Sequence, residues 1–144
     1  MVDDVMAEKI ESLQRCIRRV EAKVPASAAL LQTDLDAQDI LTVNLERAAQ
    51  QVVDLALHVL STRDIPLPNN MADCIRALVP LGLTASTADR MAKAVGFRNL
   101  SVHAYRAVDW QIVHVIATQH MDDFRAFIRE VASLQSSPKK TQKP

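Results

Sequence analysis

The chain has 144 residues, which is enough for one domain with a sizeable core and too few for two ordinary domains. Its 2 glycines and 3% aromatic residues argue against a Gly-rich phosphate loop, a Rossmann turn and a stacking platform for single-stranded nucleic acid. With 17 basic and 17 acidic residues the formal net charge is +0, so a global nucleic-acid-binding surface is not expected. A local one remains open, because the stretch from Arg90 to Arg106 contains basic residues and no acidic residue.

The two cysteines, Cys16 and Cys74, lack metal-ligand spacing and are predicted to be free buried thiols. The N-terminus has neither a basic region nor an apolar run typical of a signal peptide. No stretch approaches the length of about 18 apolar residues that a membrane span needs. These features predict a cytoplasmic protein.

Two long helices are predicted in the first half of the chain, at residues 3–24 and 37–62. In each, apolar residues recur in alternating steps of about four and three, which places them on one helical face. Pro25 ends the first helix, and Asp36 or Asp39 is expected to cap the second. The two faces are expected to pack within the chain, although packing across a dimer stays open. They consist of Met6, Ile10, Leu13, Ile17, Val20 and Val24 in the first helix, and Leu41, Leu45, Ala48, Val52, Leu55 and Val59 in the second.

The second half of the chain is also predicted to be helical. A proline-containing loop at 65–70 leads to a short helix at 71–79, and Thr84 or Ser86 is expected to cap a helix over 86–107. Asp109 begins a last helix that continues past Val131. Residues 136–144, with their Ser, Pro, Lys and Gln, are expected to form a disordered basic tail. The predicted fold is therefore an all-α antiparallel bundle of four long helices and a short one, covering residues 1–135.

The segment that stands out chemically runs from Val95 to Tyr105, because it places Arg98, Asn99, His103 and Tyr105 within eight residues. Arginine is a permanent cation whose planar fork grips phosphate at two points. Histidine can accept or donate a proton near neutral pH. Together they form a minimal set for cleaving an RNA phosphodiester without a metal: the imidazole removes the 2′-hydroxyl proton, and the guanidinium stabilises charge on the phosphate.

The spacing of these residues does not bring all of them to one face of an ideal helix. Asn99 and His103 are four residues apart and share a face, as do Arg98 and Tyr105, which are seven apart. Arg98 and His103, however, are separated by about 140° around the axis. Three alternatives are open: a helix distorted near Gly96, an Arg98 side chain that reaches round, or a second chain that brings its own copy close.

The other polar and aromatic candidates have simpler structural interpretations. His58 is expected in the core or at its boundary, and His114 and His120 on a helix surface, because no nearby ligands complete a metal site. Trp110 is expected in the core. Asp122 and Asp123 are expected on a solvated face.

The motif R-N-x3-H-x-Y, preceded by Gly96 and Phe97, resembles the signature of the HepT family, the HEPN-domain RNase toxins of HepT–MntA toxin–antitoxin modules. The similarity extends to the stretch from Asp39 to His58 and to the stretch from Val108 to Val113, and covers about residues 5–135. The resemblance implies a HEPN-type helical bundle that forms a homodimer, with the motif helices lining a shared cleft.

The resemblance also implies a function and roles for the motif residues. Arg98 and His103 would be the catalytic pair of a metal-independent endoribonuclease that leaves a 2′,3′-cyclic phosphate, and Asn99 would support them. No cofactor is implied. The partners would be the RNA substrate and an MntA-like nucleotidyltransferase antitoxin, which neutralises the toxin by transferring AMP to Tyr105. The added bulk and negative charge would oppose RNA binding.

Two alternatives of other classes stay open at this point. One is a noncatalytic HEPN-like subunit that binds the substrate of a nucleotidyltransferase or regulates it. The other is a helical scaffold or dimerisation module. The presence of both Arg98 and His103 favours the enzyme, since neither alternative needs the pair.

Overall fold

The computed structural model describes residues 3–103 and 108–136, and for residues 97–103 and 135–136 it describes the backbone alone. Within these ranges all regular secondary structure is helical, which confirms the predicted all-α class. Among the described helices, none combines the length and the apolar character that crossing a membrane requires. The helices are α1 (Asp4–Lys23), α2 (Ala28–Leu31), α3 (Leu35–Thr62), α4 (Met71–Arg76), α5 (Ala85–His103), α6 (Trp110–Gln119) and α7 (Met121–Ser136), with a 3₁₀ turn at Val79–Leu81.

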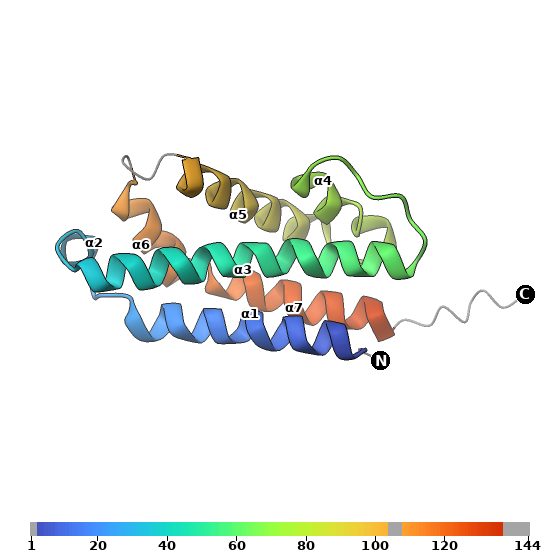
Figure 1. The fold of residues 1–144 in the computed structure, drawn as a ribbon, viewed down its shortest axis with the longest axis horizontal. Helices are drawn as coiled ribbons and strands as arrows, with labels where there is room; N and C mark the ends of the chain where they lie inside the picture. Colours follow the sequence, from blue (N-terminus) through green and yellow to red (C-terminus); the bar gives the residue numbers. More distant parts are fainter. Residues whose placement is uncertain (1–2, 104–107, 137–144) are drawn as a thin grey trace, which may run out of the picture.

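The helices form an elongated bundle around α3, which runs the length of the molecule (Figure 1). Helix α1 lies along one side of α3 and makes its most extensive packing there, while α5 and α4 lie on the other side. Helix α7 packs against both α1 and α5. The short helix α2, the start of α6 and the last turns of α5 gather at the same end of the bundle.

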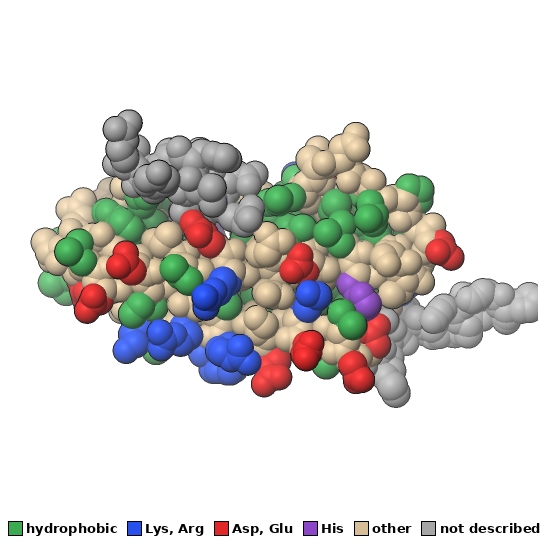
Figure 2. All heavy atoms as spheres, in the orientation of Figure 1, with side chains coloured by type: hydrophobic (Ala, Val, Ile, Leu, Met, Phe, Trp, Pro, Cys, Tyr) green, Lys and Arg blue, Asp and Glu red, His purple; other side chains and the backbone are tan. Residues whose placement is uncertain are grey.

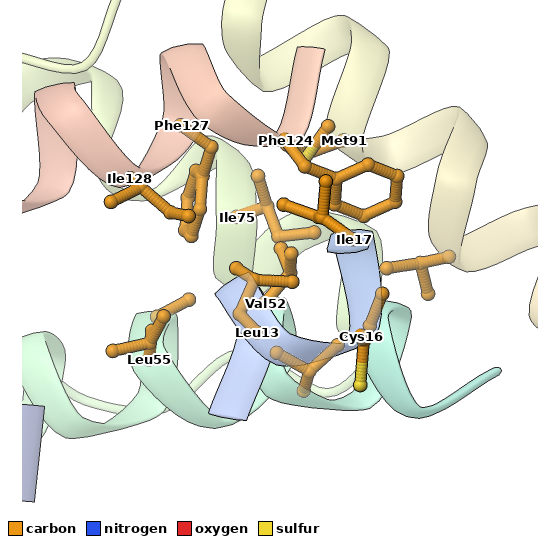
Figure 3. Close-up of a cluster of buried hydrophobic side chains, with 14 of the residues drawn as sticks. Leu13, Cys16, Ile17, Val52, Leu55, Ile75, Met91, Phe124, Phe127 and Ile128 are labelled. Atoms are coloured by element: carbon orange, nitrogen blue, oxygen red, sulfur yellow. The ribbon is translucent and has the colours of Figure 1, made fainter. Parts of the chain in front are cut away.

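The apolar faces predicted for the first two long helices form the centre of the core. The predicted positions of α3 from Leu41 to Val59 are all buried, and so are four of the six on α1. Ile10 and Val24, the other two, are half-buried against the same cluster. These faces therefore pack within the chain, as expected. Figure 3 shows Leu13, Ile17, Val52 and Leu55 of the two helices turned toward one another, with Ile75, Met91, Phe124 and Phe127 closing the cluster.

Several local predictions are confirmed and others are wrong. Cys16 and Cys74 are free and buried, and burial raises the pKa of both thiols. The cap of α3 is Asp34, whose carboxylate accepts a hydrogen bond from the Ala37 N–H at 3.0 Å, and not Asp36 or Asp39. Trp110 is only half-buried, at the margin of the core.

The predicted last helix is in fact two helices, α6 and α7, which are separated at His120. The buried residues Ala117, Met121 and Phe124 follow one another in steps of four and three, as on one continuous helix, so periodicity alone did not reveal the break. At the break, the Nδ1 atom of His120 lies 2.8 Å from the carboxylate of Asp123. The break allows α6 to turn toward α2 while α7 packs along α1 and α5.

The first turn of α5 is held by Glu130 of α7, and this link positions the helix that carries the motif. The Glu130 carboxylate accepts hydrogen bonds from the Thr84 N–H at 2.9 Å and from the Thr87 hydroxyl at 2.7 Å. The Thr84 hydroxyl in turn accepts a bond from the Thr87 N–H, which confirms Thr84 as the cap. Burial acts to raise the pKa of Glu130, but these hydrogen bonds outweigh it and the pKa lies below its ordinary value.

Replacing Glu130 with Ala is expected to lower the free energy of unfolding by about 1–2 kcal/mol, because two donors at the start of α5 lose a charged acceptor. The contribution is present above pH 4.5, the ordinary pKa, and is lost as the pH falls through the lower folded-state value. Denaturant unfolding at pH 7 and pH 3.5 checks this. Glu130→Gln retains a hydrogen-bond acceptor and should therefore lose less unfolding free energy than Glu130→Ala. An equal loss of unfolding free energy for Glu130→Ala at both pH values would contradict the link between α7 and α5.

Candidate functional site

The motif predicted to carry the chemistry lies in the last turns of α5 and in the residues that follow. Arg98, Asn99 and His103 belong to the described backbone of α5, which is helical from Ala85 to His103. Tyr105 lies in the segment 104–107, outside the described residues. The structure thus places three of the four predicted site residues on one helix, within two turns of one another.

The helical backbone of α5 excludes one of the three alternatives left by the motif spacing, a helix distorted near Gly96. Helix α5 continues through Gly96 to His103, so Gly96 does not interrupt it. On such a backbone Arg98 and His103 are displaced by about 7.5 Å along the axis and by about 140° around it. What remains is that the Arg98 side chain reaches round the helix or that a second chain completes the site.

Helix α6 begins just after the motif and is held at its start and at its middle. The Asp109 carboxylate accepts a hydrogen bond from the Gln111 N–H at 3.0 Å and caps the first turn. Further along, the Nε2 atom of His114 lies 2.8 Å from the Pro25 carbonyl oxygen, so this nitrogen is the donor. His114 therefore ties α6 to the connection between α1 and α2.

Basic residues precede the motif on α5, and one of them, Arg90, contacts the carboxylate of Asp123 on α7. Arg90 and Lys93 lie on the exposed part of α5, one to two turns before Arg98. The carboxylate of Asp123 lies 3.5 Å from Nη1 of Arg90 and 2.8 Å from Nδ1 of His120. The prediction of a solvated Asp123 is therefore wrong: its side chain is only 17% exposed and accepts hydrogen bonds from two partners.

Two adjoining hollows flank α6 next to these residues. One, of about 290 Å³, lies between α5 and the α6–α7 junction and has Arg90, Lys93 and His120 in its wall. The other, of about 620 Å³, is wider and reaches from Ala28 on α2 to Asp109 at the start of α6. Both are lined by Ile116 and His120, so they adjoin at these two side chains.

The described residues offer no ready metal site, since none of their His, Cys, Asp and Glu side chains form a cluster of three or more. His58 lies 2.9 Å from the carboxylate of Asp3 and joins α3 to the start of α1, which agrees with its predicted place at the core boundary. That contact, together with the α1 cap, lowers the pKa of Asp3. These groups have structural roles away from the motif.

The surface charge is unevenly distributed. Figure 2 shows basic side chains gathered along the lower edge of the face on which α3 lies, over the second half of α1, with acidic side chains beside them. That half of α1 carries four exposed basic residues, Arg15, Arg18, Arg19 and Lys23. The balanced total charge therefore conceals local positive surfaces, one on α1 and another on α5.

Comparison with known proteins assigns the family. A model of the family described as "Ribonuclease HepT-like" matches residues 9–131. The chain belongs to this family. Among individual relatives, the mRNA nuclease HepT of Shewanella oneidensis is 30% identical over 128 residues, which cover 88% of this chain and 96% of the relative.

Solved structures give the same result. The chain is similar to a toxin from a toxin–antitoxin complex with AMP-PNP, with a TM-score of 0.83, 27% identity and coverage of 91% of this chain and 99% of that one. It is also similar to the tri-AMPylated Shewanella oneidensis HEPN toxin in complex with the MNT antitoxin, with a TM-score of 0.84, 28% identity and coverage of 92% and 99%. These likenesses confirm the HEPN-type bundle predicted from the sequence.

The sequence identified the motif but not its surroundings in the HepT-like fold. Arg90, Lys93, His120 and Asp123 meet beside the motif helix, yet His120 and Asp123 were assigned only to helix surfaces. A local signal existed, because a histidine and an aspartate three residues apart face each other on a helix or at its start. No comparable signal links Arg90 with Asp123, since 33 residues separate them.

Proposed function

We propose that this chain is the toxin of a toxin–antitoxin pair and that it cleaves RNA as a metal-independent endoribonuclease. The observation that carries the proposal is the motif R-N-x3-H-x-Y at the end of α5, in a chain that the HepT-like family model matches from residue 9 to residue 131. The relative that is an mRNA nuclease supports an enzyme over a noncatalytic binding subunit. Messenger RNA is therefore the first substrate to test.

In the proposed mechanism the protein supplies a base and a fixed positive charge. His103 removes the proton of the 2′-hydroxyl, which attacks the adjacent phosphorus while the bond to the 5′-oxygen breaks and that oxygen takes a proton from water. Arg98 binds the phosphate and stabilises the negative charge that grows on it in the transition state. Asn99, one turn before His103, supports the imidazole or the substrate. The products are a 2′,3′-cyclic phosphate and a 5′-hydroxyl.

We further propose that a homodimer forms the complete site. On a continuous helix the displacement between Arg98 and His103 favours a cleft shared by two copies of α5. The end of the bundle that holds the motif also exposes large apolar side chains, which is typical of a surface that pairs with another protein. They are Leu30 on α2, Leu35 on α3, and Ile112 and Val115 on α6, with exposed fractions of 41–71%.

An MntA-like nucleotidyltransferase antitoxin is proposed to neutralise the toxin by transferring AMP to Tyr105. The similar Shewanella toxin is AMPylated and is bound to its MNT antitoxin, and another similar complex contains AMP-PNP. AMP on the residue two positions after His103 would add bulk and negative charge where RNA phosphate must bind. The proposed site of action is the cytoplasm, and the proposed domain covers residues 1–135 with residues 136–144 as a tail.

Replacing His103 or Arg98 with Ala is expected to abolish toxicity, because each loses a group that acts on the phosphate. The expected loss of cleavage rate is about 10²-fold or more for either variant. Growth and RNA integrity are followed after induction of wild type and variants, with His58→Ala as the matched histidine control. Equal toxicity of wild type and His103→Ala would reject the role of His103.

Tyr105→Phe is expected to remain an active ribonuclease and to resist the antitoxin, because it keeps the ring and lacks the hydroxyl that accepts AMP. Intact mass after coexpression with the neighbouring nucleotidyltransferase should show a gain of one or more AMP units for wild type and none for the variant. Adenylate mapped to a residue other than Tyr105 would contradict this assignment.

Leu35→Glu or Ile112→Glu is expected to weaken the dimer, since a charge would be buried at the proposed interface. Molar mass measured by light scattering on a sizing column should fall from that of a dimer toward that of a monomer. Leu67→Glu is the matched control, because Leu67 is also exposed but lies in the loop between α3 and α4. A dimer that persists in both variants would place the interface elsewhere.

A further inference from the structure

The smaller of the two hollows, here termed the α5–α6 pocket, has the character of a ligand site. Its floor is apolar and comes from three helices: Leu45 of α3, Met91 of α5 and Phe124 of α7. Each of these side chains is at most 2% exposed, so the apolar surface open to a ligand comes from the half-buried Ala94 and Ile116 in the same lining. Figure 3 shows Met91 and Phe124 side by side in the core. The volume of about 290 Å³ is near the lower end for small-molecule pockets, which begin at about 300 Å³.

The rim of the pocket is polar and carries net positive charge. Arg90 and Lys93 of α5 and His120 and Asp123 of the α6–α7 junction line it. Asp123 supplies one negative charge against two cations, and it orients Arg90 and His120 because its carboxylate contacts both, at 3.5 and 2.8 Å. An apolar floor beneath a cationic rim fits a flat aromatic base that carries a phosphate.

The histidine at the rim offers a further contact. An ionised carboxylate only accepts hydrogen bonds, so the Asp123 contact places a proton on Nδ1 of His120. In the neutral imidazole the Nε2 atom is then an acceptor, and it has no hydrogen-bond partner among the described residues. An acceptor in this place suits a base with an exocyclic amino group, as adenine, cytosine and guanine have.

The pocket lies next to the motif. Ala94, in its wall, is one turn before Arg98 on the same side of α5, a rise of about 6 Å. Successive phosphates of an RNA strand are separated by a comparable distance. The pocket also shares Ile116 and His120 with the wider hollow that reaches Asp109 at the start of α6. A strand bound at the motif therefore has a direct path into the pocket.

We propose that the α5–α6 pocket binds the nucleotide adjacent to the scissile phosphate of the RNA substrate and prefers a base with an exocyclic amino group. The base packs on the apolar lining at Ala94 and Ile116, Arg90 and Lys93 contact its phosphate, and Nε2 of His120 accepts a hydrogen bond from its amino group. This inference rests on the proposed ribonuclease function. It adds the part of the site that selects the position of cleavage.

The first test measures steady-state cleavage of a short RNA by unmodified toxin, so that no AMP attached to the protein competes for the pocket. The double variant Arg90→Gln/Lys93→Gln should raise KM about tenfold and leave kcat within about twofold, because it removes substrate contacts and no reacting group. The exposed ion pair between Arg90 and Asp123 contributes little stability, so the variant should fold.

The matched control removes the same charge elsewhere. Arg18 and Arg129 line a groove of about 440 Å³ between α1 and α7, whose lining includes no residue of α5. Arg18→Gln/Arg129→Gln should change KM by less than about twofold. If both double variants raise KM equally, or if neither does, binding is a general charge effect or occurs elsewhere, and the proposal is overturned.

The second test concerns the base. RNA that lacks the base next to the cleaved bond should bind wild type about fivefold more weakly or worse, since it loses the stacked contact. Ala94→Phe fills the pocket from its wall. This variant should bind intact RNA more weakly than wild type does, and should bind intact and abasic RNA equally well. Wild type that cleaves both RNAs with the same KM would contradict a base-binding pocket.

The third test is independent of catalysis and separates this inference from the proposed function. Titration of the protein with 5′-AMP as the probe should shift the ring NMR signals of His120, identified by their loss in His120→Gln. If wild type cleaves no RNA, the ribonuclease proposal fails and this titration still tests the pocket. Signals of His120 that stay unmoved at millimolar 5′-AMP would overturn the proposal.

Discussion

The arrangement of the site depends on how α5 is held, because this helix carries the motif and both cations of the adjoining pocket. At its first turn the carboxylate of Glu130 accepts hydrogen bonds from Thr84 and Thr87, and so joins α5 to α7. Further along, Ala88, Met91 and Val95 are buried against the rest of the bundle. These contacts fix the direction of α5 and direct its last turns, with Arg98 and His103, toward the end occupied by α2 and α6.

A consequence of this fixed helix is that one copy separates its two reacting groups. Five residues on a continuous helix give a displacement that places Arg98 and His103 on different sides of α5. In the dimer that we propose, two copies related by a twofold axis bring the guanidinium of one and the imidazole of the other to a common cleft. The exposed apolar residues near that end of the bundle offer a surface for such pairing. Catalysis then depends on dimerisation, because each proposed site needs residues from both copies.

The sequence predicted the parts of this molecule that depend on local or periodic signals. The regular apolar steps on α1 and α3 are sufficient to predict both helices and the core between them, because burial follows the helical period. The motif was visible because arginine, asparagine, histidine and tyrosine in eight residues carry chemistry as well as structure. The likeness to the HepT family then supplied the bundle and the dimer as expectations.

What the sequence did not reveal depends on contacts between distant residues or on breaks that leave periodicity intact. The separation of α6 from α7 at His120 interrupts the backbone, yet the apolar spacing runs across it. Glu130 meets Thr84 across 46 residues, and Asp123 meets Arg90 across 33, so neither pair leaves a local pattern. The pocket beside the motif is assembled from four helices and exists only once they pack.

The central claim is that Arg98 and His103 of the motif cleave RNA without the help of a metal. The most direct measurement is cleavage of a defined RNA by the purified, unmodified protein in excess EDTA, with the 3′ ends of the products identified by mass. We expect undiminished cleavage, a 2′,3′-cyclic phosphate end and no product from His103→Ala. Cleavage that EDTA abolishes, or that His103→Ala retains, would contradict it.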